Sequence, residues 1–163
     1  MNDKYTDEVR ERWGDTEAYK ESQRRTANYT SDDWSELSAE MEAIMAGFAD
    51  LKAEGVAPDD ERARLQVEKL KEFITERMYT CTDDILSGLG QMYVADERFT
   101  KNIDKHGEGA AAYVSACIKN YCLSLRNNKS IRLDDVLPDR YSYINTPLQW
   151  SISCWMICAV KPV

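Results

Sequence analysis

The sequence predicts an all-α fold formed by one small domain. Apolar residues recur every three or four positions in several long segments, helix-capping residues precede those segments, and glycine or proline often follows them. The chain has 163 residues, which is enough to bury one hydrophobic core. We therefore expect a single helical domain, with one exception at the C-terminus described below.

The first segment, residues 1 to 29, is predicted to form two short helices with little apolar surface. Either Asp15 or Thr16 caps the second helix. Helices in proteins are stabilised mostly by packing, so we expect this segment to be only loosely held without a ligand. Its large aromatic side chains, Trp13 and Tyr19, then serve either to dock the segment on the core or to contact a ligand.

A longer helix is predicted to begin after Thr30. Thr30 and Asp33 have the spacing of a capping box, in which each side chain accepts a hydrogen bond from the backbone of the other residue. Gly55 marks the end of this helix, as glycine often does. Its apolar residues are Trp34, Leu37, Met41, Ile44, Phe48 and Leu51.

The next helix is predicted to follow Pro58, with Asp59 as its N-cap. The connection between the two helices is short, so we expect them to lie antiparallel. The apolar face of this helix is predicted to consist of Leu65, Leu70, Phe73, Ile74 and Met78.

The segment from Tyr79 to Phe99 is central to the interpretation. Thr82 and the two aspartates after it are predicted to cap a helix that contains Gly88 and Gly90. Each glycine lowers helix stability by about 1 kcal/mol relative to alanine, which indicates close approach by a backbone or a ligand. The segment is either the central helix of the core, as apolar stripes usually are, or the floor of a ligand cleft. The candidate floor residues are Tyr79, Leu89, Met92, Tyr93 and Phe99.

Two further helices are predicted before the composition changes. Asp96 begins a short helix, residues 106 to 109 form a turn, and a last helix runs from Ala110 to about Leu125.

The chain changes character after this helix. Residues 126–163 carry a net charge of +2, against −10 for residues 1–125. This tail is either a native element packed on the domain or a non-native extension, and the abrupt change favours the second. We therefore divide the chain into a lid segment (1–29), a helical core (30–125) and a tail (126–163).

Composition excludes several classes of function. The net charge is −8, so a nucleic-acid-binding surface is not expected. No secretion signal or membrane-spanning stretch is recognised, so the five cysteines are expected to be free thiols of a cytoplasmic protein. There is no Cys-x-x-Cys pair, and the only histidine is His106, so neither a metal nor another cofactor is expected.

Four segments match one known family in the right order. They read R-E-R-W-G-D-T-E-A-Y (10–19), T-S-D-D-W (30–34), Y-T-C-T (79–82) and G-L-G-Q-M-Y-V-A-D-E-R-F-T (88–100). On these motifs, residues 8 to 122 resemble the TipAS antibiotic-recognition domain, the ligand-binding module of TipA-like MerR-type regulators.

The resemblance implies a globin-like helical fold with a deep ligand cleft. Members of the family bind bulky peptide-like antibiotics, notably thiopeptides and in some cases albicidin. In the regulators, ligand binding promotes transcription of multidrug-resistance genes, whereas shorter forms sequester the drug. The N-terminal segment of the family folds over the ligand, which agrees with a loosely held lid segment here.

One departure from the family pattern bears on the chemistry. Members that trap thiopeptides carry a cysteine that captures a dehydroalanine covalently, and the resemblance aligns that position with Gly88. Cys81 matches the other cysteine of the family. It is either a ligand contact or a small buried residue, and a thiol near a helix start can have a lowered pKa. We therefore predict non-covalent binding.

These observations predict a non-enzymatic domain that binds a peptide-like antibiotic. The chain is expected to be a monomer without direct nucleic-acid contact, either free-standing or part of a regulator. The alternative is an interaction module whose cleft takes a partner's helix, and a thiol enzyme is a weaker option because no basic partner lies near Cys81 in the sequence. The candidate ligand contacts are Trp13, Tyr19, Tyr79, Cys81, Gly88, Leu89, Met92, Tyr93 and Phe99.

Overall fold

The computed structural model describes residues 7, 10–11 and 14–129, the last two by their backbone only. Within these residues the chain forms helices and no strand, which confirms the all-α prediction. Trp13 and the tail from residue 130 onward lie outside the described residues. The helices are α2 (Glu17–Thr26), α3 (Ser31–Ala53), α4 (Glu61–Arg77), α5 (Asp83–Ala95), α6 (Glu97–Asp104) and α7 (Ala110–Lys129).

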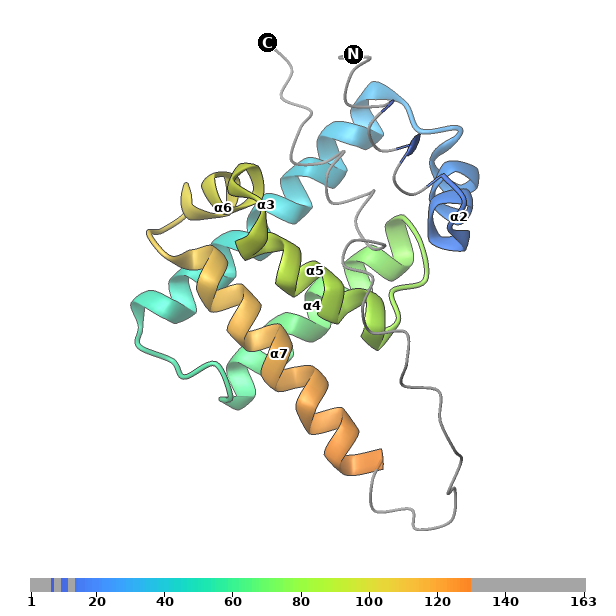
Figure 1. The fold of residues 1–163 in the computed structure, drawn as a ribbon. Helices are drawn as coiled ribbons and strands as arrows, with labels where there is room; N and C mark the ends of the chain where they lie inside the picture. The colour runs from blue at the N-terminus through green and yellow to red at the C-terminus, as the bar shows by residue number, and fades with distance from the viewer. Residues whose placement is uncertain (1–6, 8–9, 12–13, 130–163) are drawn as a thin grey trace.

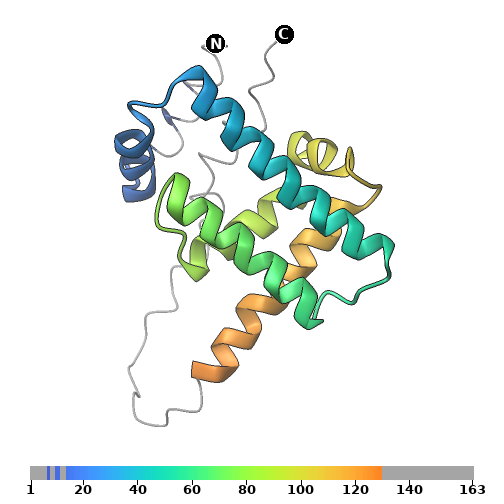
Figure 2. The same cartoon turned by 180° about the vertical axis from the view of Figure 1, so that it is seen from behind.

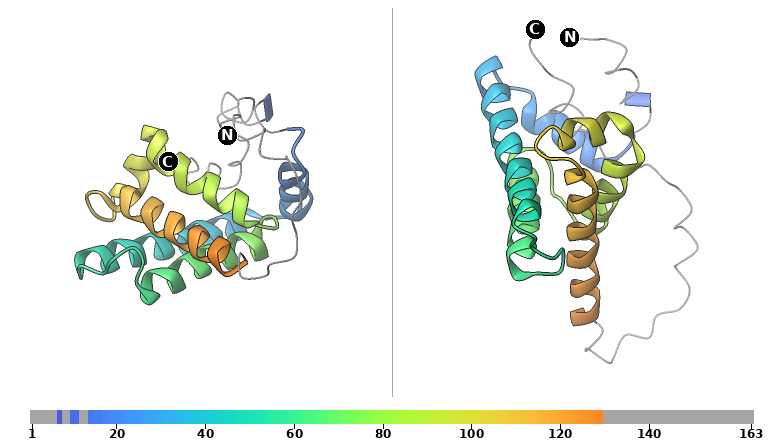
Figure 3. Two further views of the ribbon diagram at one scale, coloured as in Figure 1. Left: turned by 60° about the horizontal axis from the view of Figure 1, so that its bottom comes forward. Right: turned by 90° about the vertical axis from the view of Figure 1, so that its left-hand side faces the viewer.

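The core consists of two groups of helices, α3 with α4 and α5 with α6, and both groups pack on α7. The pair α3 and α4 is antiparallel, as the short connection predicts, and both helices pack on α7 (Figures 1 and 2). On the other side, α5 packs along α7 more extensively than any other described pair, and α6 contacts both (Figure 3). Helix α2 stands at the edge of the molecule, beside the end of α4 (Figures 1 and 2).

The helix starts follow from local capping chemistry. The Thr30 side chain accepts from the backbone N–H of Asp33 (3.3 Å), and the Asp33 carboxylate accepts from that of Thr30 (2.7 Å), so the predicted capping box is confirmed. Thr16 and Thr82 cap α2 and α5 by one bond each: their side chains accept from the backbone N–H groups of Tyr19 and Ile85. The predicted end of α3 is also confirmed, because Gly55 takes a φ of 76°.

The N-cap of α4 is Asp60, so the prediction of Asp59 is wrong. The Asp60 carboxylate accepts from the backbone N–H of Arg62 (2.8 Å), and the Asp60 N–H donates to the Ala57 carbonyl (3.0 Å) in a turn that delays the helix by one residue. Leu65 is 45 % exposed and does not belong to the apolar face of α4. Ala63 and Val67 are fully buried there instead. At the other end of the core, α7 continues four residues beyond Leu125, to Lys129.

Gly90 explains how closely α5 and α7 approach each other. A Cβ atom at this position would lie 3.0 Å from Cγ2 and 3.2 Å from Cβ of Ile118 on α7. These separations are below the optimal carbon–carbon distance, so only glycine fits without displacement. The predicted close approach is therefore real at Gly90, and its cause is a neighbouring helix.

Candidate ligand-binding site

Helix α5 has two faces with different surroundings. One face is buried in the core and consists of Ile85, Leu86, Leu89, Gly90, Met92 and Tyr93. The opposite face is exposed or partly exposed and consists of Asp84, Ser87, Gly88, Gln91 and Val94. These five positions recur at spacings of one, three and four, so they form one side of the helix. We call them the open face of α5.

The predicted floor residues are buried in the core, three of them on α5 itself. Leu89 and Tyr93 are fully buried, and Tyr93 packs against Phe99 with ring centroids 6.2 Å apart. The Thr100 hydroxyl donates to the Tyr93 carbonyl (2.8 Å), which fixes α6 against α5. Met92 and Tyr79 are also buried, with 8 % and 2 % of their surfaces exposed. These five residues thus have packing roles, and their contact with a ligand stays a prediction.

Gly88 is the one candidate residue of α5 that lies on the open face. Its exposed neighbours there, Asp84, Gln91 and Val94, were not among the predicted contacts, because large apolar and aromatic residues were favoured and these pack in the core. A helical projection opposite Leu89 and Tyr93 would have found them.

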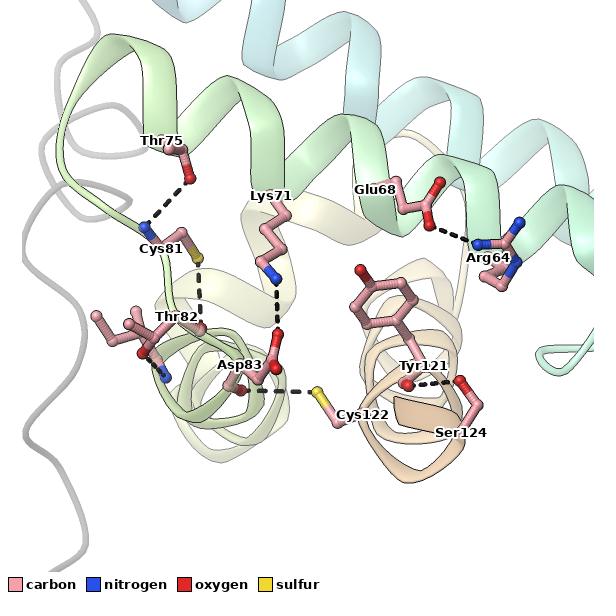
Figure 4. A network of polar contacts seen from close by, with 11 residues as sticks. Arg64, Glu68, Lys71, Thr75, Cys81, Thr82, Asp83, Tyr121, Cys122 and Ser124 are labelled. Atoms are coloured by element: carbon pink, nitrogen blue, oxygen red, sulfur yellow. Dashed lines mark hydrogen bonds and ion pairs between the residues drawn. The ribbon is translucent and has the colours of Figure 1, made fainter. Parts of the chain in front are cut away.

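Cys81 is buried, in the loop between α4 and α5 (Figure 4). Its backbone N–H donates to the Thr75 hydroxyl (3.2 Å), and its Sγ lies 3.9 Å from the Thr82 carbonyl oxygen. Burial raises the pKa of the Cys81 thiol to about 12, and the Lys71 ammonium opposes this only in part. The expectation of a lowered pKa near the helix start is therefore wrong, and the thiol is protonated at neutral pH.

An ion pair fixes the start of α5. Lys71 Nζ on α4 lies 2.6 Å from the Asp83 carboxylate and 5.8 Å from the ring centroid of Tyr121 on α7 (Figure 4). Burial lowers the pKa of Lys71, but the hydrogen bond to Asp83 and the nearby Tyr121 raise it by more. Cys122 Sγ lies 3.7 Å from the Asp83 carbonyl oxygen. These contacts join α4, α5 and α7 and set the direction in which the open face points.

Helix α2 forms most of the described part of the predicted lid segment. Tyr19 is partly buried and packs against the core, while Ser22 is the only fully buried residue of the helix. Tyr29, just after α2, packs edge-on against Trp34 with ring centroids 5.5 Å apart. The lid segment thus reaches the core through aromatic contacts at both ends of α2.

Residues 5–121 match the TipAS antibiotic-recognition domain family. The chain belongs to this family. Over 116 residues it is 41 % identical to the HTH-type transcriptional activator TipA of Streptomyces coelicolor, covering 71 % of this chain and 46 % of that protein. Over 118 residues it is 40 % identical to the HTH-type transcriptional activator mta of Bacillus subtilis, covering 72 % and 45 %. The chain therefore spans about half the length of these relatives.

A solved TipAS structure has the same fold. It is the complex of nosiheptide with TipAS, from a thiopeptide antibiotic multidrug resistance system of Streptomyces lividans. The TM-score is 0.70 at 38 % sequence identity, over 77 % of this chain and 87 % of the other. The helical TipAS fold therefore extends over most of this chain.

The TipAS domain also has an open depression of about 570 Å³ between α3 and α4. It does not include any residue of α5 or any predicted ligand contact, so it is separate from the open face. In the described part of the chain, no cluster of three or more His, Cys, Asp or Glu side chains is arranged to hold a metal ion. None of the described helices has the length and hydropathy needed to cross a membrane. The depression is lined by Glu40, Ala43, Ile44, Lys69, Glu72, Phe73, Glu76 and Arg77.

Proposed function

We propose that this TipAS domain binds bulky peptide-like antibiotics of the thiopeptide type, reversibly and without chemical conversion. The observation that carries the proposal is the likeness to the TipAS–nosiheptide complex, at 38 % identity over 87 % of that chain. A shared fold at this identity supports a shared site, although fold alone does not imply function. The arrangement of α5 adds independent support.

The open face of α5 has the chemistry that such a ligand requires. Gly88 is partly exposed and carries no side chain, and Val94, which is 49 % exposed, offers apolar surface. Gln91 carries an amide that both donates and accepts hydrogen bonds, which suits the amide groups of a peptide-like molecule. Tyr19 lies on α2 and belongs to the lid segment that is proposed to close over the ligand, together with Trp13.

We infer reversible binding because neither Gly88 nor Cys81 offers a reactive thiolate. Gly88 has no thiol where the resemblance expects the capturing cysteine. The Cys81 thiol is buried and protonated, and a protonated thiol is not the nucleophilic form. The same two facts argue against a thiol enzyme, so we propose burial of the ligand as the whole of the binding mechanism.

The biological consequence depends on the chain in which the domain works. Where a DNA-binding part is present, as in transcriptional activators, ligand binding serves as the signal for transcription. In a free-standing cytoplasmic form, the same binding event sequesters the antibiotic and confers resistance. Albicidin is the second ligand class to examine, because the family resemblance includes it.

Calorimetric titration with nosiheptide tests the proposal. We expect saturable binding, no mass increase of the protein under denaturing conditions, and changed amide NMR signals in residues 14–29. Gly88→Trp should weaken binding at least about tenfold by filling the open face, whereas Ala112→Trp, at an exposed position on α7, should not. Equal affinities of these two variants for nosiheptide would refute the proposal that the ligand binds over Gly88. If binding leaves the amide NMR signals of residues 14–29 unchanged, the lid proposal is wrong, and a module that takes a partner's helix is favoured.

A further inference from the structure

Helix α2 is attached to the rest of the domain by a group of polar contacts at its C-terminal half. The Glu21 carboxylate accepts from the backbone N–H of Thr80 (3.0 Å) and from the Thr80 hydroxyl (3.2 Å). Arg25 donates to the carbonyl of Thr75 and also pairs with Glu21. We call Glu21, Arg25, Thr75 and Thr80 the α2 clamp.

The clamp matters because α2 has little apolar surface. Its one fully buried residue is Ser22, and Ala18 and Tyr19 are only partly buried. Helix α2 is not among the helix pairs that pack extensively within the described residues. Hydrogen bonds to a charged group are stronger than neutral ones, so the clamp adds to the attachment that Tyr19 and Tyr29 provide. The pKa of Glu21 is lowered, chiefly by the Thr80 N–H, which agrees with a bound, ionised carboxylate.

The clamp holds α2 to a segment that also positions the start of α5. The Thr75 hydroxyl accepts from the Cys81 N–H (3.2 Å), and Thr80 directly precedes Cys81. Two residues later, α5 begins at Asp83. One loop therefore connects α2 to the helix that carries the open face.

We propose that Glu21 is a positioning residue: it fixes α2 to the loop between α4 and α5, so that the retention of a bound ligand depends on it. The inference rests on the proposed function for its ligand. A helix that is already in place loses less conformational freedom when the ligand binds. Loss of the clamp should therefore appear mainly as faster ligand dissociation, because most affinity changes at one site are changes in the dissociation rate.

Glu21→Ala tests the proposal, with Glu17→Ala as the matched control. Both changes replace glutamate by alanine in α2, but Glu17 is 82 % exposed, and within the described residues its ion pair is with Lys20 of the same helix. In the free protein, amide hydrogen exchange of residues 18–26 should become at least about fivefold faster in Glu21→Ala. Nosiheptide should dissociate about five to ten times faster. Glu21→Gln, which keeps an acceptor but not the charge, should lie between Glu21→Ala and the parent chain, and Glu17→Ala should match the parent within about twofold.

Hydrogen exchange and nosiheptide dissociation test the role of Glu21 and the proposed ligand separately. Unchanged exchange in α3 to α7 confirms that each variant is folded. If Glu21→Ala and Glu17→Ala exchange equally fast in α2, or release nosiheptide equally fast, the role of Glu21 is wrong. If the parent chain does not bind nosiheptide, the ligand assignment fails, and the exchange comparison still decides whether Glu21 fixes α2.

Discussion

Replacement of Gly90 by alanine tests the packing of α5 on α7. The new methyl group would lie 3.0 Å from Ile118 Cγ2, and Ile118 is 1 % exposed, so it has no room to move away. Overpacking of a core costs about 1–3 kcal/mol. Alanine in place of a helical glycine gains about 1 kcal/mol. We therefore expect Gly90→Ala to lower the free energy of unfolding by about 1 kcal/mol, which corresponds to a fall in Tm of about 2–4 °C.

The partner residue provides an internal control. Ile118→Ala alone should destabilise the domain by about 2–5 kcal/mol, because it leaves a cavity between α5 and α7. In that background the methyl group of Gly90→Ala has space, so the same change should become stabilising by about 1 kcal/mol. The change of sign gives a coupling of about 2 kcal/mol, within the range for residues in contact.

The measurement is urea and thermal unfolding, followed by circular dichroism, of four proteins: the parent chain, Gly90→Ala, Ile118→Ala and the double variant. If Gly90→Ala stabilises the parent chain by the full helix-propensity gain, the helices are not as close as described. If the effect of Gly90→Ala is the same in both backgrounds, Ile118 is not the neighbour that excludes a side chain.

Three further predictions concern the site and its surroundings. Gly88→Cys should form a covalent adduct with a dehydroalanine-containing thiopeptide, detected as a mass increase under denaturing conditions; a protein of unchanged mass would count against the alignment of this position. Cys81, whose pKa is about 12, should react with iodoacetamide at neutral pH roughly a hundredfold more slowly in the native chain than in urea, and equal rates by peptide mapping would contradict its burial. The pKa of Glu21 is lowered from 4.5, so its contribution to holding α2 is present above that value and is lost as the pH falls through the folded-state pKa. An acid titration of the Thr80 amide NMR signal should show a midpoint below 4.5, and a midpoint at or above 4.5 would refute the clamp geometry.

The helix starts were predictable because capping depends on a few neighbouring residues. Thr30 with Asp33, and Thr82 before its two aspartates, satisfy backbone N–H groups that lie within the same turn. The one wrong cap arose between two adjacent aspartates. Asp59 and Asp60 are chemically equal, and only the turn back to the Ala57 carbonyl decides between them.

The side chains of the site were harder to predict because their environment is set by distant parts of the chain. Spacing placed Leu65 on the apolar face of α4, but the smaller Ala63 and Val67 occupy the buried positions. The resemblance located the segment that contains Gly88 and Leu89, but it did not show which of these two residues points into the core. The pKa of Cys81 likewise depends on burial by other helices, which a local pattern does not report.

The division of α5 into two faces has a consequence for engineering drug sensors. Substitutions at exposed positions usually change stability by less than about 0.5 kcal/mol, whereas those in a core change it by several kcal/mol. On the proposed site, a combinatorial library restricted to Asp84, Ser87, Gly88 and Gln91 is therefore expected to vary ligand preference while most of its members stay folded. A library of the same size on the buried face would mostly yield unfolded protein, so screening for new antibiotic specificities should begin on the open face.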